Sequence, residues 1–190
     1  MPIKLSIPLI RKAVKSSSET FVGEANLKLA GVMVLLTHRD GEYWIILNRR
    51  TMTVKHHKGE ISFPGGGKDV ADRDLLFTAL RETQEEMGIN PEEVEVLGKI
   101  DVTPTQTGFL IWPFVGIIDH PYKFSLSKSE VESVLEIPLS SLFSINYRCD
   151  EIKPLKDQVQ KVPIYSFDGN VVYGATARIL DNLARLIKAA

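Results

Sequence analysis

The order of apolar and polar positions along the chain predicts a mixture of strands and helices. Residues 7–15 have the spacing of a short amphipathic helix. Residues 30–37 and 43–48 are strand-like apolar runs, and the Arg39-Asp40-Gly41 segment between them predicts a hairpin, because Asp-Gly favours tight turns. Residues 61–63 form a further short apolar run. These segments predict the beginning of a β-meander.

A second amphipathic helix is predicted at residues 75–87. Asp72 or Asp74 can cap its N-terminus, and Gly88, with Pro91 shortly beyond, ends it. At about 100° per residue its side chains separate into two faces. One face carries Leu76, Leu80, Thr83 and Met87, and the opposite arc carries Glu82, Glu85 and Glu86. We expect the first face to pack into the core and the second to point away from it.

The second half of the chain contains strand-like runs and one closing helix. Strands are predicted at residues 94–102, 109–118, 147–152 and 158–167, and an amphipathic helix at residues 174–188. Neither an internal repeat nor a linker rich in Pro, Gly or Ser divides the chain. We therefore expect an α/β protein of the α+β type, with a helical extension at 1–24 and one domain at 25–190.

The composition disfavours a protein that binds nucleic acid, spans a membrane or is held together by internal disulfides. The chain has 23 Lys plus Arg against 24 Asp plus Glu, and its formal net charge of -1 gives no general attraction to nucleic acid or anionic membranes. Its apolar runs are shorter than the roughly 20 residues that a bilayer requires. The single cysteine, Cys149, cannot form an internal disulfide. We expect a cytoplasmic protein that does not associate with membranes.

Candidate chemistry concentrates on the second helix and on the loop before it. Glu82, Glu85 and Glu86 have i, i+3 and i+4 spacing, so their side chains converge and a hard divalent cation would relieve their repulsion. Oxygen ligands suit Mg²⁺ or Mn²⁺ together with a phosphate substrate. The loop at residues 64–67, Pro-Gly-Gly-Gly, lets backbone approach such a group. The alternative is a solvated acidic face supported by an Arg81–Glu85 pair, which leaves the loop unexplained.

The same region resembles the Nudix box, in which Gly is followed after five residues by Glu and after seven more by Arg-Glu-apolar-any-Glu-Glu-any-Gly-apolar. The matching residues are Gly67, Arg81, Glu82, Glu85, Glu86, Gly88 and Ile89. Arg73 stands in place of the first Glu, and Thr83 in place of a larger apolar residue. The resemblance implies the Nudix fold, a mixed β-sheet sandwiched between α-helices.

The segment before the box resembles a Nudix subgroup, the coenzyme A pyrophosphatases. Its pattern is Arg, Ser or Thr, three residues, Arg, three residues, Gly, three residues and Phe-Pro-Gly-Gly. Residues 50–66 follow this pattern with Lys55 replacing the second Arg, which keeps the charge but loses bidentate geometry. Residues 107–109, 112–114, 137–139 and 173–177 also resemble this subgroup.

The resemblance implies a Mg²⁺- or Mn²⁺-dependent hydrolase that splits the pyrophosphate of a small nucleotide, first of all coenzyme A or a derivative. It implies that Arg81 orients the carboxylates. The implied metal ligands are Glu82, Glu85, Glu86 and the backbone of Gly66. The implied substrate-binding residues are Arg50, Lys55, His57, Gly66 and Gly67. Lys55 and His57 could also belong to an ordinary basic loop, and because many members pair, a homodimer is one expected assembly.

Three glutamates are candidates for the general base. Glu85 could serve if a metal does not fully occupy it, and Glu130 or Glu132 could reach the site from a downstream loop. The alternative is that Glu130 and Glu132 supply negative charge at the start of a helix after Ser127 or Ser129.

Three other functions fit parts of this pattern. An ADP-ribose or NADH pyrophosphatase would use the same metal helix with different contacts to the nucleoside. A noncatalytic nucleotide-binding module would keep the acidic helix only as a remnant, and the retention of all three glutamates argues against it. RNA decapping would require an extended basic surface, which the near-zero net charge disfavours.

Overall fold

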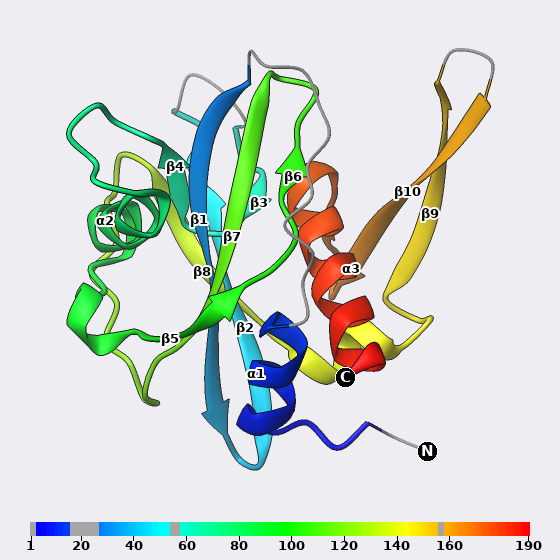
Figure 1. Ribbon diagram of the computed structural model, residues 1–190, viewed down its shortest axis with the longest axis horizontal. Helices are drawn as coiled ribbons and strands as arrows, with labels where there is room; N and C mark the ends of the chain where they lie inside the picture. Colours follow the sequence, from blue (N-terminus) through cyan, green and yellow to red (C-terminus); the bar gives the residue numbers. More distant parts are fainter. Residues whose placement is uncertain (1–2, 16–26, 54–57, 156–157) are drawn as a thin grey trace.

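A computed structural model describes residues 3–15, 27–53, 58–155 and 158–190. In this part of the chain, α-helices cover both faces of a mixed β-sheet (Figure 1). Helix α2 (Leu75–Met87) lies on one face, and α1 (Ile7–Lys15) and α3 (Gly174–Ala189) lie together on the other. The predicted fold class, a mixed sheet sandwiched between helices, is confirmed.

The larger sheet has eight strands among the described residues. Its main path runs β3-β2-β1-β7-β5, while β4 pairs with β1, β6 with β7 and β8 with β2. The central pair, β1 with β7, is parallel, and the other pairs are antiparallel. The strands are β1 (Lys28–Arg39), β2 (Glu42–Arg50), β3 (Ile61–Ser62), β4 (Gly65–Gly67), β5 (Glu95–Lys99), β6 (Thr103–Pro104), β7 (Phe109–Ile117) and β8 (Val131–Pro138).

The predicted hairpin joins β1 to β2. Asp40 and Gly41 both have positive φ angles, 52° and 78°, as the tight turns that match strand twist require. A smaller sheet has the order β11-β10-β9, with β9 (Arg148–Leu155), β10 (Gln158–Phe167) and β11 (Asn170–Val172). The β9–β10 hairpin extends away from the rest of the protein (Figure 1).

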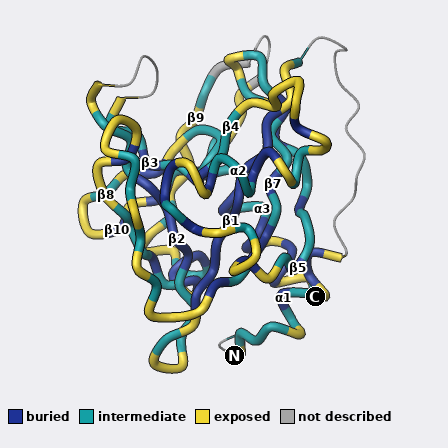
Figure 2. Tube along the Cα trace, turned by 90° about the vertical axis from the view of Figure 1, so that its left-hand side faces the viewer, coloured by how far each residue is buried: buried dark blue, intermediate teal, exposed yellow. Residues whose placement is uncertain are grey.

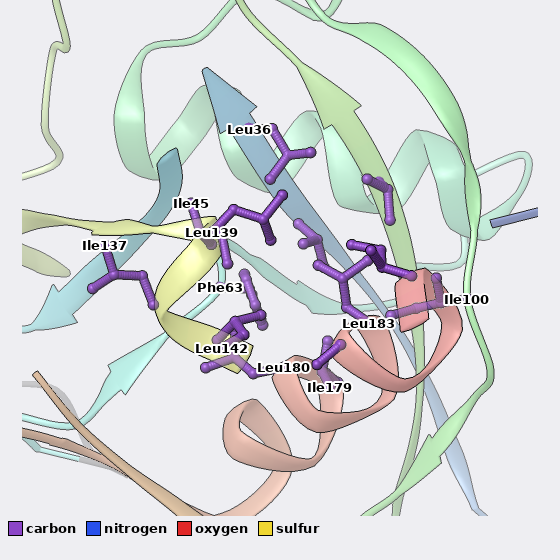
Figure 3. Close-up of a cluster of buried hydrophobic side chains, with 14 of the residues drawn as sticks. Leu36, Ile45, Phe63, Ile100, Ile137, Leu139, Leu142, Ile179, Leu180 and Leu183 are labelled. Carbon is purple, nitrogen blue, oxygen red and sulfur yellow. The ribbon is translucent and has the colours of Figure 1, made fainter. Parts of the chain in front are cut away.

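The apolar core has two parts, one on each face of the larger sheet. The larger part lies between the sheet, α1, α3 and the 3₁₀ turn η2 (Leu139–Phe143), and Figure 3 shows Leu36, Leu142 and Leu180 within it. The smaller part joins Met33 and Leu35 of β1 to α2. Because β1 is buried on both faces along most of its length, it forms the centre of the fold (Figure 2).

The structure differs from the sequence-based picture at three places. In the described residues no helix begins at Ser127 or Ser129, as the alternative role of Glu130 and Glu132 required: a turn there leads into β8, and the backbone N–H of Glu130 donates to Ser127 O at 2.9 Å. Strand β8 was not predicted, because its sequence VESVLEIP carries charges that suit an edge strand, which pairs on one side only. The glycine segment, expected to be a loop, contains β4 and pairs with β1.

A second 3₁₀ turn, η1 (Pro91–Glu93), follows α2. Within the residues that the structure describes, none of the helices combines the length and the apolar character needed to cross a bilayer.

Candidate active site

Helix α2 has the bounds that its sequence predicts, and its two ends are capped. The side chain of Asp74 accepts a hydrogen bond from the backbone N–H of Phe77 at 2.7 Å, so Asp74, rather than Asp72, is the N-cap. Gly88 ends the helix with φ 72°, and its N–H donates to Gln84 O. These ends fix the register of the helix, and therefore the direction of each glutamate.

The backbone of Gly66 lies directly beside the carboxylate of Glu82. A Cβ at position 66 would lie 2.5 to 2.7 Å from the carboxyl carbon and oxygens of Glu82, so only glycine leaves room for this contact. Burial raises the pKa of Glu82, and the neighbouring Arg81 opposes that rise. The predicted closeness of the glycine segment to the acidic helix is therefore present in the structure.

Glu86 is buried, with 2% of its surface exposed, contrary to the expectation that it points away from the core. The reason is that α2 ends beside polar groups of β2 and β4, which can satisfy a buried carboxylate. Asn48 Nδ2 donates to Glu86 Oε2 at 2.7 Å, the N–H of Gly65 donates to the same oxygen at 3.4 Å, and Arg50 Nη1 lies 3.4 Å from Oε1.

The charge of Glu86 is incompletely compensated. Burial raises its pKa to about 7, Arg50 opposes this rise, and the negative charge of Glu82 adds to it. The negative charge of Glu130 raises the pKa of both Glu82 and Glu86 further. Three carboxylates from α2 and from the turn before β8 thus share one region of negative potential.

Arg81 joins the helix carboxylates to the segment that precedes the helix. Its guanidinium lies 2.9 Å from both Glu82 Oε1 and Glu85 Oε2, and 3.0 Å from Asp72 Oδ1. Its hydrogen bonds hold the pKa of Asp72 well below the usual range. Sequence reasoning assigned Asp72 only as a candidate cap, whereas the structure shows it as the main partner of Arg81.

Glu85 and Glu86 differ strongly in their surroundings. The side chain of Glu85 is 58% exposed and contacts Arg81, while that of Glu86 is buried. Within the described residues, no three Asp, Glu, His or Cys side chains lie close enough to hold a metal ion as they stand. The expected convergence of the three helix glutamates on one point is therefore not observed.

The turn that carries Glu130 is attached to both α2 and β2. The N–H of Ser127 donates to Glu86 O at 2.9 Å, and the N–H of Thr51 donates to Glu130 O at 2.9 Å. Glu132 lies in β8, whereas Glu130 lies in the turn before it and acts through its charge on both Glu82 and Glu86. Of the two downstream candidates for the base, Glu130 is the one that lies beside the acidic residues.

The predicted substrate-binding residues are placed in part. Arg50 ends β2 and faces Glu86, and Gly67 pairs with Ala30, where an added Cβ would meet the ring of Phe109 at 3.8 Å. Lys55 and His57 fall outside the described residues. Asn48, which donates to Glu86, was missed. The sequence marks it only as one polar residue at the end of an apolar run.

The residues present fit a divalent cation bound through oxygen. Glu82 and Glu86 are desolvated carboxylates whose negative charges repel each other, and the backbone of Gly66 lies against Glu82. A Mg²⁺ site commonly uses one or two protein carboxylates, with water and phosphate oxygens completing the shell. An incomplete set of protein ligands is therefore what such a site requires.

Comparison with known proteins agrees with this geometry. Residues 27–141, more than half of the chain, match the NUDIX domain family model. A protein of Citrobacter koseri called "Uncharacterized Nudix hydrolase NudL" is 36% identical over 160 residues, which cover 84% of this chain and 82% of that protein. A relative of the same name in Pectobacterium atrosepticum is 36% identical over 140 residues, covering 74% of this chain and 73% of the relative.

Solved structures share the fold at lower identity. The MutT/nudix family protein of Enterococcus faecalis superposes with a TM-score of 0.54 and 13% identity, covering 90% of this chain and 66% of that one. A C. elegans Ap4A hydrolase superposes with a TM-score of 0.52 and 18% identity, covering 62% of this chain and 86% of that one. At these identities the likeness concerns the fold alone. With the family match and the relatives above 30% identity, the chain belongs to the Nudix hydrolase family.

Proposed function

We propose that this protein hydrolyses the pyrophosphate bond of a small nucleotide with the help of a divalent cation, Mg²⁺ or Mn²⁺. The observation that carries the proposal is the placement of Glu82 and Glu86 beside the glycine strand β4, with Arg50 at the same point. Two carboxylates with raised pKa values and a neighbouring cationic side chain suit a metal-bound phosphate better than a structural salt bridge.

Glu82, Glu86 and the backbone of Gly66 would hold the cation, with Glu85 as a further ligand after a change of rotamer. The bound cation supplies an activated water and neutralises charge on the pyrophosphate. Arg81 holds Glu82 and Glu85 in place through two ion pairs. Arg50, which lies beside Glu86, is our candidate for contact with a phosphate group, and the sequence assigns Lys55, His57 and Gly67 to the same task.

Glu130 is our candidate for the general base. It is exposed, its turn is fixed by hydrogen bonds to α2 and β2, and its charge acts on both Glu82 and Glu86. An exposed carboxylate near the metal ligands can accept a proton from water and release it to solvent. Glu85 is held by Arg81, which makes it the weaker candidate for this role.

Coenzyme A or a derivative is the substrate that we propose first, cleaved to phosphopantetheine and adenosine 3′,5′-bisphosphate. The support is the resemblance of residues 50–66 to the coenzyme A pyrophosphatase pattern, whose first Arg corresponds to Arg50. ADP-ribose and NADH are alternatives, because the metal residues would serve them equally. Substrate choice within one fold depends on side chains outside the metal site.

A product assay with Mg²⁺ tests the proposal, offering coenzyme A, ADP-ribose and NADH separately. Release of phosphopantetheine and adenosine 3′,5′-bisphosphate, lost in the Glu85→Gln/Glu86→Gln variant, is the expected result. Cleavage of ADP-ribose alone would keep the reaction and change the substrate. Failure to cleave any of the three, with nucleotide binding retained, would favour a noncatalytic nucleotide-binding module.

A further inference from the structure

Asn48 and Ser62 form a hydrogen-bonded pair behind Glu86. Asn48 is completely buried in β2 and lies opposite Ser62 of β3 in the strand register. Ser62 Oγ donates to Asn48 Oδ1 at 2.7 Å, and Asn48 Nδ2 donates to Glu86 Oε2 at 2.7 Å. A continuous series of hydrogen bonds therefore connects β3 to the carboxylate on α2.

The chemistry of the three groups fixes the direction of this series. A carboxylate that binds a metal ion is ionised and only accepts hydrogen bonds, so the amide nitrogen of Asn48 faces Glu86. The amide oxygen of Asn48 then faces Ser62, whose hydroxyl supplies the proton that this buried acceptor needs. Ser62 thus determines which end of the Asn48 amide is presented to Glu86.

The two oxygens of Glu86 are engaged unequally. Oε2 accepts from Asn48 at 2.7 Å and from the N–H of Gly65 at 3.4 Å. Oε1 faces Arg50 Nη1 at 3.4 Å, which is longer than a normal N–H···O hydrogen bond of about 2.7–3.2 Å. The Gly65 contact is equally long, so Asn48 is the donor that holds Oε2, and Oε1, which has no contact this short, is the oxygen that a cation can take.

We propose that Asn48 and Ser62 are positioning residues, which hold Glu86 Oε2 and thereby present Glu86 Oε1 to the divalent cation. This inference rests on the proposed function, because it takes Glu86 as a metal ligand. The hydrogen-bond partners behind a ligand fix its orientation, and their loss typically lowers metal affinity by roughly 10–100-fold. Neither residue touches substrate in this proposal.

The test is a Mn²⁺ titration of the full-length protein without nucleotide, with free Mn²⁺ measured by electron paramagnetic resonance. We expect Ser62→Ala and Asn48→Ala to bind Mn²⁺ at least roughly 10-fold more weakly than wild type. Ser62→Thr keeps the hydroxyl and should bind as wild type does. Ser141→Ala is the matched control, because Ser141 is a buried serine whose hydroxyl donates to Pro138 O at the far end of β8.

Circular dichroism shows which variants are folded, and Ser62→Ala alone decides the question if Asn48→Ala does not fold. Wild-type Mn²⁺ affinity in the folded variants, with hydrolysis by the wild type intact, overturns the positioning role and leaves the proposed function standing. An equal loss of affinity in Ser141→Ala also overturns it, because the effect would then be general. A wild type that neither binds Mn²⁺ nor cleaves a nucleotide overturns both proposals.

Discussion

The carboxylate of Glu82 lies against the backbone of Gly66, in the space that any side chain at position 66 would need. The contact joins β4 to α2 at the point where both carry proposed metal ligands. Because the obstacle is the end of a flexible side chain, a methyl group at position 66 can be accommodated only if Glu82 moves.

Gly66→Ala should therefore lower turnover while the protein stays folded. A displacement of about 1 Å in a reacting group can cost up to roughly 100-fold in rate. Gly67→Ala is the comparison in the same strand, because its Cβ would meet only the ring of Phe109 at an ordinary 3.8 Å. The two variants are compared by kcat, since a weakened contact of Gly67 with substrate would raise KM instead. Steady-state kinetics should show a much larger loss for Gly66→Ala, and equal losses for the two variants would contradict the importance of the Glu82 contact.

Glu130→Gln should reduce kcat with little change in KM. A general base contributes roughly 10²–10⁴-fold, and glutamine keeps the size of the side chain but cannot accept the proton. Glu132→Gln is the matched control, because Glu132 is an exposed glutamate two residues away on β8. A wild-type kcat in Glu130→Gln would exclude Glu130 as the general base, and Glu85 would then be the remaining candidate.

The Asp72–Arg81 pair should make stability depend on pH. Hydrogen bonds from Arg81 lower the pKa of Asp72 in the folded protein, whereas the unfolded chain has an ordinary value of about 3.9. A carboxyl group whose pKa is lower in the folded protein than in the unfolded chain stabilises the folded state at pH values above its unfolded pKa. This contribution is lost progressively as the pH falls below the unfolded pKa.

Asp72→Asn should accordingly lower the urea midpoint at pH 7, by an amount that shrinks as pH falls below about 4. Asp69→Asn is the control, because Asp69 is 76% exposed and lies 3.8 Å from Arg81, and exposed pairs contribute little. A gap between Asp72→Asn and wild type that stays constant from pH 7 to pH 3 would refute the linkage.

The N-cap of α2 allows a stability test that does not involve catalysis. Asp74→Ala removes the acceptor of the Phe77 N–H and should destabilise the protein by about 1 kcal/mol. Asp74→Asn keeps a capping oxygen and should change stability little. Thermal unfolding of both variants provides the measurement, and similar midpoints for Ala and Asn would show that the cap contributes nothing.

Helix α2 was predictable to the residue because its signals are local. Asp74 and Gly88 mark its ends through their own backbone chemistry, and the chain needs no distant partner to specify them. The Nudix box likewise has fixed spacing within one helix and the strand before it. Thr83, a departure from that pattern, is explained by a local contact, because its hydroxyl donates to Ala79 O at 2.7 Å in the buried face.

The burial of Glu86 and strand β8 were not predictable in the same way. Helical periodicity places Glu86 beside Glu82 and Glu85, but its burial depends on Asn48 and Arg50, which come from a strand more than 30 residues earlier. Strand β8 depends on pairing with β2, and because it contains charged residues its sequence does not show a clear strand pattern. Contacts between distant parts of the chain decide both features.

The segment that links β7 to β8 is attached to α2 by hydrogen bonds from residues 125 and 127. The backbone N–H groups of Ser125 and Ser127 donate to the carbonyls of Met87 and Glu86 at the end of the helix, so this anchor lies between the exposed tip at residues 119–121 and Glu130. Exposed tips of this kind are the sites where proteins accept inserted sequence. A peptide tag or a fluorescent label could therefore be placed there without displacing the proposed base.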